Sequence, residues 1–238
     1  MHDKVPPISA QQNFWNTWNV IREKGLSPVP QRQALVVTDW LRRMRRTDLD
    51  IIDVCCGAGW MCERLLEFGS VMGIDLADEV LQRARQRVPQ ARFLAGDFNA
   101  LDLQSESFDV AVSLEVLSHV ADQKAFLANI ARLLRPGGYL MLATQNRYVL
   151  ERCNIDPPGP GQIRRWVDKR ELQGLLRDCY EVEALFAVTP AGDHGILRLV
   201  TSQKLNAVLS RVFSKARLEA AQEKLGIGWT LMALACKR

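Results

Sequence analysis

The segment IIDVCCGAG, residues 51–59, is the most informative stretch of the chain. Three apolar residues and an aspartate, as in a buried strand, run directly into a turn that holds two glycines. Gly57 and Gly59 have no Cβ atom, so the backbone there can pass close to a ligand. A helix that starts after the glycines would present unpaired N–H groups and a partial positive charge. The pattern fits a site for a pyrophosphate or an amino-acid carboxylate, and a tight turn without a ligand fits it too.

Strand-like and helix-like segments alternate around this turn. Short apolar runs, expected of strands buried on both faces, occur at residues 51–54, 71–74, 91–94, 110–114 and 139–144. Helical spacing is found between them at residues 60–68, 79–87 and 124–134. Pro136-Gly137-Gly138 predicts the stop of the last of these helices, and two more strands are expected at residues 182–188 and 229–235. The pattern predicts an α/β fold with a doubly wound, seven-stranded, mostly parallel sheet, an antiparallel last strand and helices on both faces.

Two aspartates stand where the next two strands end. Asp75 follows the second strand, where a carboxylate can accept hydrogen bonds from both ribose hydroxyls of a nucleotide. It can instead cap the next helix, although Asp78 and Glu79 offer a better cap. Asp97, in Gly96-Asp97-Phe98, can accept from the amino group of an adenine while an aromatic ring packs nearby; an ordinary aspartate turn is the alternative.

In this order, the motifs resemble the signature of class I (Rossmann-like) S-adenosylmethionine-dependent methyltransferases. The segments that carry the resemblance are DVCCGAG at 53–59, the acid at Asp75, GDF at 96–98, FDVAVSLEVLSHV at 108–120 and LLRPGGYLMLAT at 133–144. The resemblance extends over residues 48–146 and is closest to the small-molecule branch that includes the ubiquinone and menaquinone biosynthesis methyltransferases. Cys55 stands where many relatives carry glycine. A nicotinamide-dependent dehydrogenase is disfavoured, because the third glycine of its turn is missing.

The resemblance implies S-adenosylmethionine as the cofactor and assigns residues to it. The expected contacts are Asp53, Gly57 and Gly59 for the methionine part, Asp75 for the ribose, and Leu76, Asp97 and Phe98 for the adenine. Cys55 is a further expected cofactor contact, and Leu114 with Glu115 is expected beside the reaction site. We expect residues 1–47, after a flexible start of about ten residues and with helices near 14–23 and 31–46, to form an N-terminal helical cover or lid. Residues 48–238 are expected to form the S-adenosylmethionine-binding domain. Residues 153–162 and the connection 191–228 do not fit the alternation, and we interpret the latter as a substrate-side insert.

Two histidines are candidate bases. Methyl transfer from a sulfonium is an in-line displacement, to which a protein contributes chiefly proximity and orientation. A base is needed only where the accepting atom must lose a proton of high pKa. His119, shortly after the fourth strand, and His194, in a glycine-flanked loop, are placed to act. His119 can instead be a hydrogen-bonded structural residue, and His194 a surface residue without a role.

The acceptor end of the site has no decisive motif. Four aromatic residues either line a pocket for a flat acceptor or pack in the core: Trp15, Trp18, Trp166 and Phe186. Arg164 and Arg165 either bind an acidic group or begin a solvated helix. We expect O-methylation of a small metabolite; methylation of RNA or protein, and a non-catalytic nucleotide-binding module, are the alternatives. The Asn/Asp-Pro-Pro-Tyr/Phe motif of amino-group nucleic-acid methyltransferases is absent after the fourth strand.

Composition sets the remaining expectations. The chain has 238 residues, 47% of them hydrophobic, and a net charge of +4, as in an ordinary globular protein without a nucleic-acid-binding charge pattern. Its six cysteines show no zinc-binding spacing, so we expect free thiols and no metal. No signal peptide and no apolar run near 18 residues is visible. We therefore expect a cytoplasmic protein without a membrane span that binds a small-molecule acceptor and is able to form a homodimer.

Overall fold

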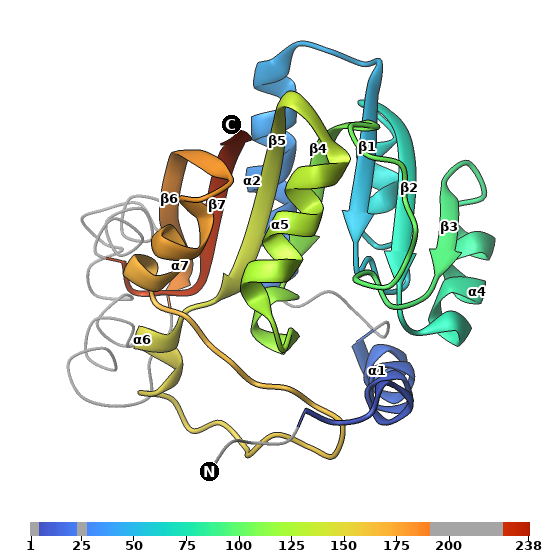
Figure 1. Ribbon diagram of the computed structural model, residues 1–238. Coiled ribbons are helices and arrows are strands. Elements are labelled where there is room, and N and C mark those ends of the chain that lie inside the picture. The colour runs from blue at the N-terminus through green and yellow to red at the C-terminus, as the bar shows by residue number, and fades with distance from the viewer. Residues whose placement is uncertain (1–4, 23–27, 191–225) are drawn as a thin grey trace, which may run out of the picture.

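The computed structural model describes residues 5–22, 28–190 and 226–238, which form a seven-stranded sheet in the order β3-β2-β1-β4-β5-β7-β6 (Figure 1). The strands are β1 Leu49–Val54, β2 Gly69–Asp75, β3 Arg92–Ala95, β4 Phe108–Leu114, β5 Leu134–Gln145, β6 Tyr180–Pro190 and β7 Gly228–Lys237. The pairs among β1 to β5 are parallel, whereas β7 is antiparallel to both β5 and β6. The predicted fold class is confirmed.

Helices cover both faces of the sheet and one of its edges. They are α1 Ile8–Arg22, α2 Pro28–Met44, α3 Cys62–Leu65, α4 Asp78–Arg87, α5 Gln123–Leu133, α6 Arg147–Leu150 and α7 Lys169–Leu176, together with the 3-10 turn η1 Leu117–His119. α2, α3 and α4 contribute to the apolar cluster on one face, and α5 and α7 to the cluster on the other. α1 lies beyond the carboxyl ends of β1 and β2, below the sheet in Figure 1. Among the described residues, no helix is both long and apolar enough to cross a bilayer.

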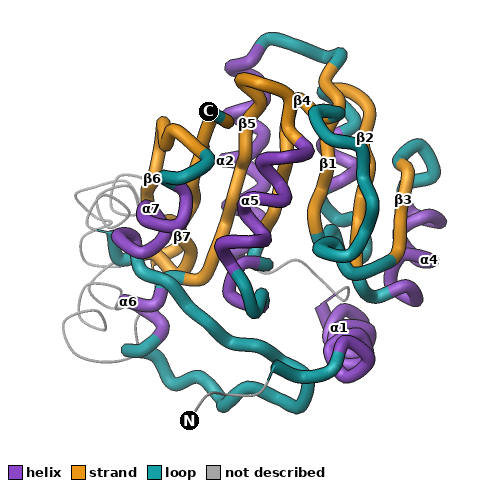
Figure 2. The backbone as a smooth tube through the Cα atoms, in the orientation of Figure 1, coloured by secondary structure: helices purple, strands orange, loops and turns teal. Residues whose placement is uncertain are grey.

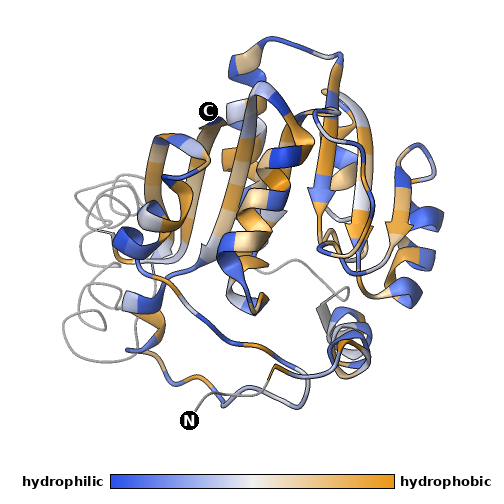
Figure 3. Cartoon of the chain, in the orientation of Figure 1, coloured by the Kyte–Doolittle hydropathy of each residue, from blue (hydrophilic) through white to orange (hydrophobic). Residues whose placement is uncertain are grey.

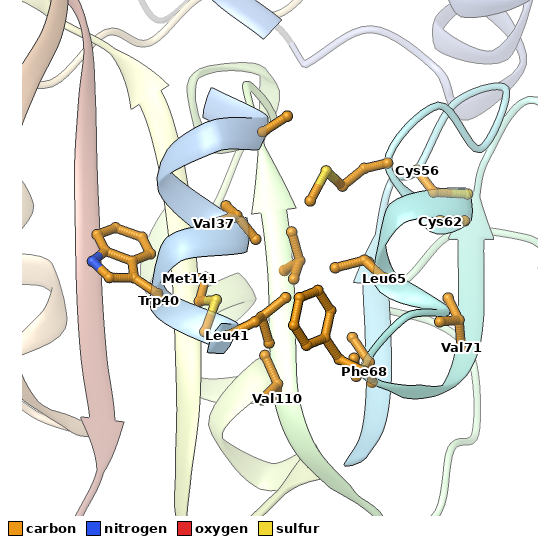
Figure 4. Packing of buried hydrophobic residues seen from close by; sticks show 14 of the residues in the cluster. Val37, Trp40, Leu41, Cys56, Cys62, Leu65, Phe68, Val71, Val110 and Met141 are labelled. Atoms are coloured by element: carbon orange, nitrogen blue, oxygen red, sulfur yellow. The ribbon is translucent and has the colours of Figure 1, made fainter. Parts of the chain in front are cut away.

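Alternation along β1 explains why the sheet is buried on both faces. Leu49 and Ile51 belong to one apolar cluster, and Ile52 and Val54 belong to the other. The strands are correspondingly hydrophobic along their length (Figure 3). In the first cluster, Trp40 and Leu41 of α2 lie against the sheet beside side chains of α3 (Figure 4). α2 is therefore a layer of the core, unlike α1.

Helix ends differ from the sequence prediction in three places. α1 begins at Ile8, inside the segment predicted as a flexible lead-in; the carbonyl of Pro7 accepts from the N–H groups of Ala10 and Gln11. The helix predicted at 60–68 is limited to α3, because residues 57–61 form turns. α5 ends at Leu133, ahead of the predicted stop, and its C-cap residue is already extended.

The segment Pro136-Gly137-Gly138 therefore does not stop a helix. It lies within β5, where the pairing of β4 with β5 shifts register between Phe108 and Val110. Gly137 has φ +74°, a conformation that glycine adopts without strain. The three residues make an irregularity at the start of a strand.

A long loop returns from the sheet to α1. Between α6 and α7 the chain runs without regular structure along the same edge that α1 occupies (Figure 2). A Cβ atom on Gly161 would lie 2.3 Å from the carbonyl oxygen of Ala10, and one on Gly159 would lie 3.3 Å from the ring of Phe14. The glycines thus allow this loop to pack closely against α1.

Candidate active site

A cavity of about 300 Å³ lies at the carboxyl ends of β1 to β4. Open α/β sheets bind ligands at this edge, where the strand order reverses. The lining residues are 55–57 and Trp60 after β1, Asp75 and Leu76 at the end of β2, 96–99 after β3, 114–116 and 119–122 after β4, Phe126, Ile163, and Val5, Ile8, Gln11, Trp15, Trp18 and Asn19 of the N-terminal segment. The cavity volume is at the lower end of the range for small-molecule sites.

The turn after β1 has three residues in the left-handed region. Cys55 has φ +60°, Gly57 +56° and Gly59 +70°. For Cys55 this conformation costs roughly 1–2 kcal/mol, which explains why glycine suits the position in relatives. A Cβ atom on Gly57 would lie 2.9 Å from the side-chain oxygen of Asn19, so any side chain there would press against α1. The turn brings the backbone of residues 55–57 to the cavity wall.

The predicted helix N-terminus directly after the glycines is absent. The N–H of Gly59 donates to the carbonyl of Cys56, and the chain continues in turns until α3 begins at Cys62. Two left-handed glycines in three residues interrupt the helical path. Gly59 itself does not line the cavity: its backbone faces Phe93 and Ala84, and an added Cβ would lie 3.2 and 3.3 Å from them.

Asp75 closes the turn and lines the cavity. One carboxylate oxygen accepts from the N–H of Gly57 at 2.7 Å, and the other accepts from the N–H of Ala77 at 2.8 Å. The expectation that Asp78 and Glu79 cap α4 is wrong, because the N-cap residue is Ala77 and no side chain caps it. Burial raises the pKa of Asp75 above its ordinary value despite these two backbone donors. Donors from a ligand would further favour the ionised carboxylate.

Beyond β3, the residues predicted to meet the adenine also line the cavity. Asp97 accepts from the N–H of Asn99 at 3.0 Å, so the aspartate turn that sequence left as an alternative is present. Phe98 is buried and packs edge-on against Phe126, with ring centroids 5.3 Å apart. Leu76 lies at the same wall.

Asp53 is buried beneath the turn and does not line the cavity. The thiol of Cys62 donates to its carboxylate at 3.3 Å. Burial is the main reason that the pKa of Asp53 rises to about 7; the Cys62 thiol lowers it, and the negative charge of Asp75 adds to the increase. Asp53 therefore supports the turn from below.

His119 lies on the cavity wall at the end of η1. Its Nδ1 atom is 2.8 Å from the carbonyl oxygen of Ile163, and its ring meets Trp15 edge-on with centroids 4.8 Å apart. Because a carbonyl can only accept, Nδ1 carries the hydrogen, and in the neutral ring Nε2 carries the lone pair. The second predicted base, His194, and most of the predicted insert 191–228 lie outside the described residues.

Glu115, at the end of β4, is held by residues that sequence did not connect with it. Its Oε1 accepts from the amide of Gln33 in α2 at 2.6 Å and from the hydroxyl of Thr230 in β7 at 2.7 Å. Gln33 and Thr230 are fully buried, and Glu115 has φ +64°. Local patterns gave no indication of this cluster, because its members come from three distant parts of the chain.

The predicted acceptor residues divide into two groups. Trp15 and Trp18 line the cavity, whereas Phe186 packs edge-on against Trp40 and the indole N–H of Trp166 donates to Gln145 at 2.7 Å. Neither arginine of the loop lines the cavity or starts α7, which begins at Lys169. Arg164 stacks over the ring of Trp166, and Arg165 donates to the carbonyl of Ala121.

The order of the motifs, the strand order and the position of the cavity define an S-adenosylmethionine-dependent methyltransferase of class I. Comparison with known proteins agrees: residues 52–142 match the family model for a methyltransferase domain. The chain belongs to the S-adenosylmethionine-dependent methyltransferases, and its cofactor is S-adenosylmethionine.

Individual relatives match between about half and three quarters of the chain. A ubiquinone biosynthesis O-methyltransferase of Chelativorans sp. is 33% identical over 126 residues, which are 51% of this chain and 49% of that protein. A Mycolicibacterium smegmatis protein that carries the name of an S-adenosylmethionine-dependent methyltransferase is 30% identical over 188 residues, 78% of this chain and 66% of that one. The chain thus spans between half and two thirds of the length of these relatives. An S-adenosylmethionine-dependent methyltransferase of Mesorhizobium loti has the same fold, with a TM-score of 0.60, 22% identity, and coverage of 84% of this chain and 98% of that one.

Proposed function

We propose that the protein transfers the methyl group of S-adenosylmethionine to a hydroxyl oxygen of a small-molecule acceptor. The single observation that carries the proposal is the position of His119, with its Nδ1–H donated to Ile163, on the wall of the same cavity that Asp75 and Asp97 line. The likeness to a relative named as a ubiquinone biosynthesis O-methyltransferase supports the choice of oxygen.

The residues present fit the cofactor. Gly57 leaves space beside α1 that a Cβ atom would fill, and the carboxylates of Asp75 and Asp97 offer acceptors for hydroxyl and amino groups. We assign the ribose to Asp75, the adenine to Leu76, Asp97 and Phe98, and the methionine part to the backbone of residues 55–57, with Asp53 and Gly59 shaping that turn from behind. When bound, the cofactor supplies a methyl group on a sulfonium that is already an activated leaving group.

His119 then has a defined task. An acceptor hydroxyl that attacks the methyl carbon must lose its proton, and Nε2 of a ring protonated at Nδ1 can take it. Trp15 and the Ile163 carbonyl hold the ring from two directions, which limits its rotation. Leu114 and Glu115, at the end of β4, border the same part of the cavity.

The charge of the wall supports a small acceptor over RNA. Among the described residues, the cavity is lined by the acids Asp75, Asp97, Glu115 and Asp122 and by no lysine or arginine. Such a wall suits a sulfonium cation and disfavours phosphate groups, which bind to basic residues. Val5, Ile8 and Trp18 are exposed and apolar, and they add an apolar surface near the acceptor side.

α1 serves as a cover in this proposal. Trp15 packs on Ala58, Ala77 and Val80, and the amide of Gln12 donates to the carbonyl of Leu76 at 3.1 Å. α1 thereby joins the turn after β1 to the end of β2, directly over the proposed cofactor site. Trp15→Ala should weaken cofactor binding while the two large apolar clusters on the faces of the sheet, to which α1 does not contribute, stay packed.

The test combines cofactor binding with methyl transfer. The protein is incubated with methyl-labelled S-adenosylmethionine and a metabolite extract, and labelled products are separated by chromatography. We expect a small labelled product whose formation falls by about 100-fold or more in His119→Gln, the scale of general base catalysis, with cofactor affinity nearly unchanged. Label in RNA or protein would overturn the choice of acceptor. Full activity of His119→Gln would show that the reaction needs no histidine base and that orientation of the acceptor and the cofactor is sufficient.

A further inference from the structure

The His119 ring depends on a loop that lies far from it in sequence. The carbonyl oxygen bonded to Nδ1 belongs to Ile163, in the irregular segment between α6 and α7. The distance between the ring and this carbonyl depends on how the loop packs against η1. The hydrogen bond of Nδ1 is therefore kept while the loop keeps its register against η1.

Several hydrogen bonds set this register. The N–H of Arg165 donates to the carbonyl of Ser118 at 2.7 Å. The side-chain amide of Gln123 donates to the carbonyl of Leu117 at 2.9 Å and to the carbonyl of Arg165 at 2.8 Å. A single NH2 group thus bridges the turn that carries His119 and the loop that carries Ile163.

β5 adds a second bridge of the same kind. The side-chain oxygen of Gln145 accepts from the hydroxyl of Ser118 at 3.0 Å and from the indole N–H of Trp166 at 2.7 Å. The two bridges and the Ser118–Arg165 backbone bond connect the same two segments. Because Gln145 is the last residue of β5, this second bridge connects the loop to the sheet as well as to η1.

We propose that Gln123 is a positioning residue, which acts through the Ile163 carbonyl to hold His119 in the tautomer with hydrogen on Nδ1. The inference deepens the proposed function, since it rests on His119 as the base. The chemistry is specific: the two carbonyls are acceptors only, so the bridging group must supply two N–H donors. Without the bridge, the loop loses two of the hydrogen bonds that hold it against η1, and the Ile163 carbonyl, the acceptor that selects the tautomer, is held less firmly. A ring with hydrogen on Nε2 cannot accept the proton of a hydroxyl at that atom.

The experiment reads the tautomer directly, without an acceptor. Nitrogen-15 chemical shifts of the histidine rings are recorded on the full chain, and His119→Gln identifies the signal of His119. We expect hydrogen on Nδ1 in the wild type and a mixture of tautomers in Gln123→Met and Gln123→Glu, which lack donors. Gln123→Lys, which keeps donors on a flexible stem, should restore the wild-type signal. Lys124→Met is the matched control on the same helix, since Lys124 pairs only with the exposed Asp178 among the described residues.

Methyl transfer supplies the second measurement. In Gln123→Met, kcat should fall by about tenfold or more, with cofactor affinity within about twofold of the wild type. An unchanged Nδ1 signal in both Gln123→Met and Gln123→Glu overturns the positioning role, whatever the activity. A changed signal together with full activity of His119→Gln leaves Gln123 as the group that sets the tautomer but overturns the catalytic use of the ring. The two failures are therefore distinguishable.

Discussion

Replacement of Asp53 by asparagine should change how the stability of the protein depends on pH. Burial raises the pKa of Asp53 in the folded protein from 3.8 to about 7. Between these two values the folded state keeps a proton that the unfolded state has released. The free energy of unfolding therefore falls as pH rises from about 4 to 7, and this contribution levels off above pH 7.

The magnitude follows from the two pKa values. Between pH 5 and pH 8, Asp53 alone should remove about 2.5 kcal/mol from the free energy of unfolding, at 1.36 kcal/mol for each pH unit within the window. An asparagine side chain does not titrate, so Asp53→Asn should gain about this amount relative to the wild type over the same interval. Titrating groups that do not interact with Asp53 affect both proteins equally and cancel in the difference.

The assay is urea unfolding of cofactor-free protein, followed by tryptophan fluorescence at pH 5, 6, 7 and 8. Cys62→Ala provides a second variant, because loss of the thiol donor should raise the pKa of Asp53 further and extend the decline to higher pH. A difference between wild type and Asp53→Asn that stays constant from pH 5 to pH 8 would refute the reasoning.

Four further variants test other parts of the structure. Asp75→Ala should weaken binding of S-adenosylmethionine by about 1.5–3 kcal/mol in calorimetry, because a carboxylate that accepts from the ribose is lost; unchanged affinity would contradict the assignment. Tyr180→Phe removes a buried hydroxyl that donates to an α5 carbonyl at 2.9 Å, and should lower the free energy of unfolding by about 1 kcal/mol. Gly228→Ala places a Cβ atom 2.3 Å from the carbonyl oxygen of Val188 and should cost roughly 3 kcal/mol or more, whereas Gly174→Ala, in an open position of α7, should stabilise by about 0.5–1 kcal/mol. Equal stability of the two alanine variants would contradict the close approach of β6 and β7.

The sheet was predictable because its strands are buried on both faces. A strand such as 110–114 is apolar except for the buried Ser113, and turn residues separate it from the next helix. The ends of the helices were less predictable. α1 has no acidic residue in its first turn, so nothing in the sequence indicated that it begins at Ile8. Trp60 and Met61 were expected in a helix because the left-handed conformation of the glycines before them is visible only in the backbone angles.

The site was predicted wherever its residues follow a strand. Asp75 and Asp97 lie on the cavity wall because the carboxyl ends of parallel strands meet at one edge. The hydrogen-bond partners of two other site residues, His119 and Glu115, were not predictable. The carbonyl of Ile163 reaches His119 from a loop, and Gln33 and Thr230 reach Glu115 from opposite ends of the chain. Contacts of this kind leave no periodic pattern, since each depends on one side chain and the final packing of distant segments.

The position of β7 has a consequence for synthesis of the protein. Strands β1 to β5 pair among themselves, but of the described strands β6 pairs only with β7, which inserts between β5 and β6. β6 ends at Pro190 and β7 begins at Gly228, a stretch that a ribosome translates in about two to eight seconds at ~5–20 residues per second. During that interval the edge of β5 and both edges of β6 have no partner strand, and unpaired edges are sites of aggregation. The nascent chain is therefore most exposed to misassembly between the synthesis of its last two strands, and a chaperone that binds extended segments would act on it there.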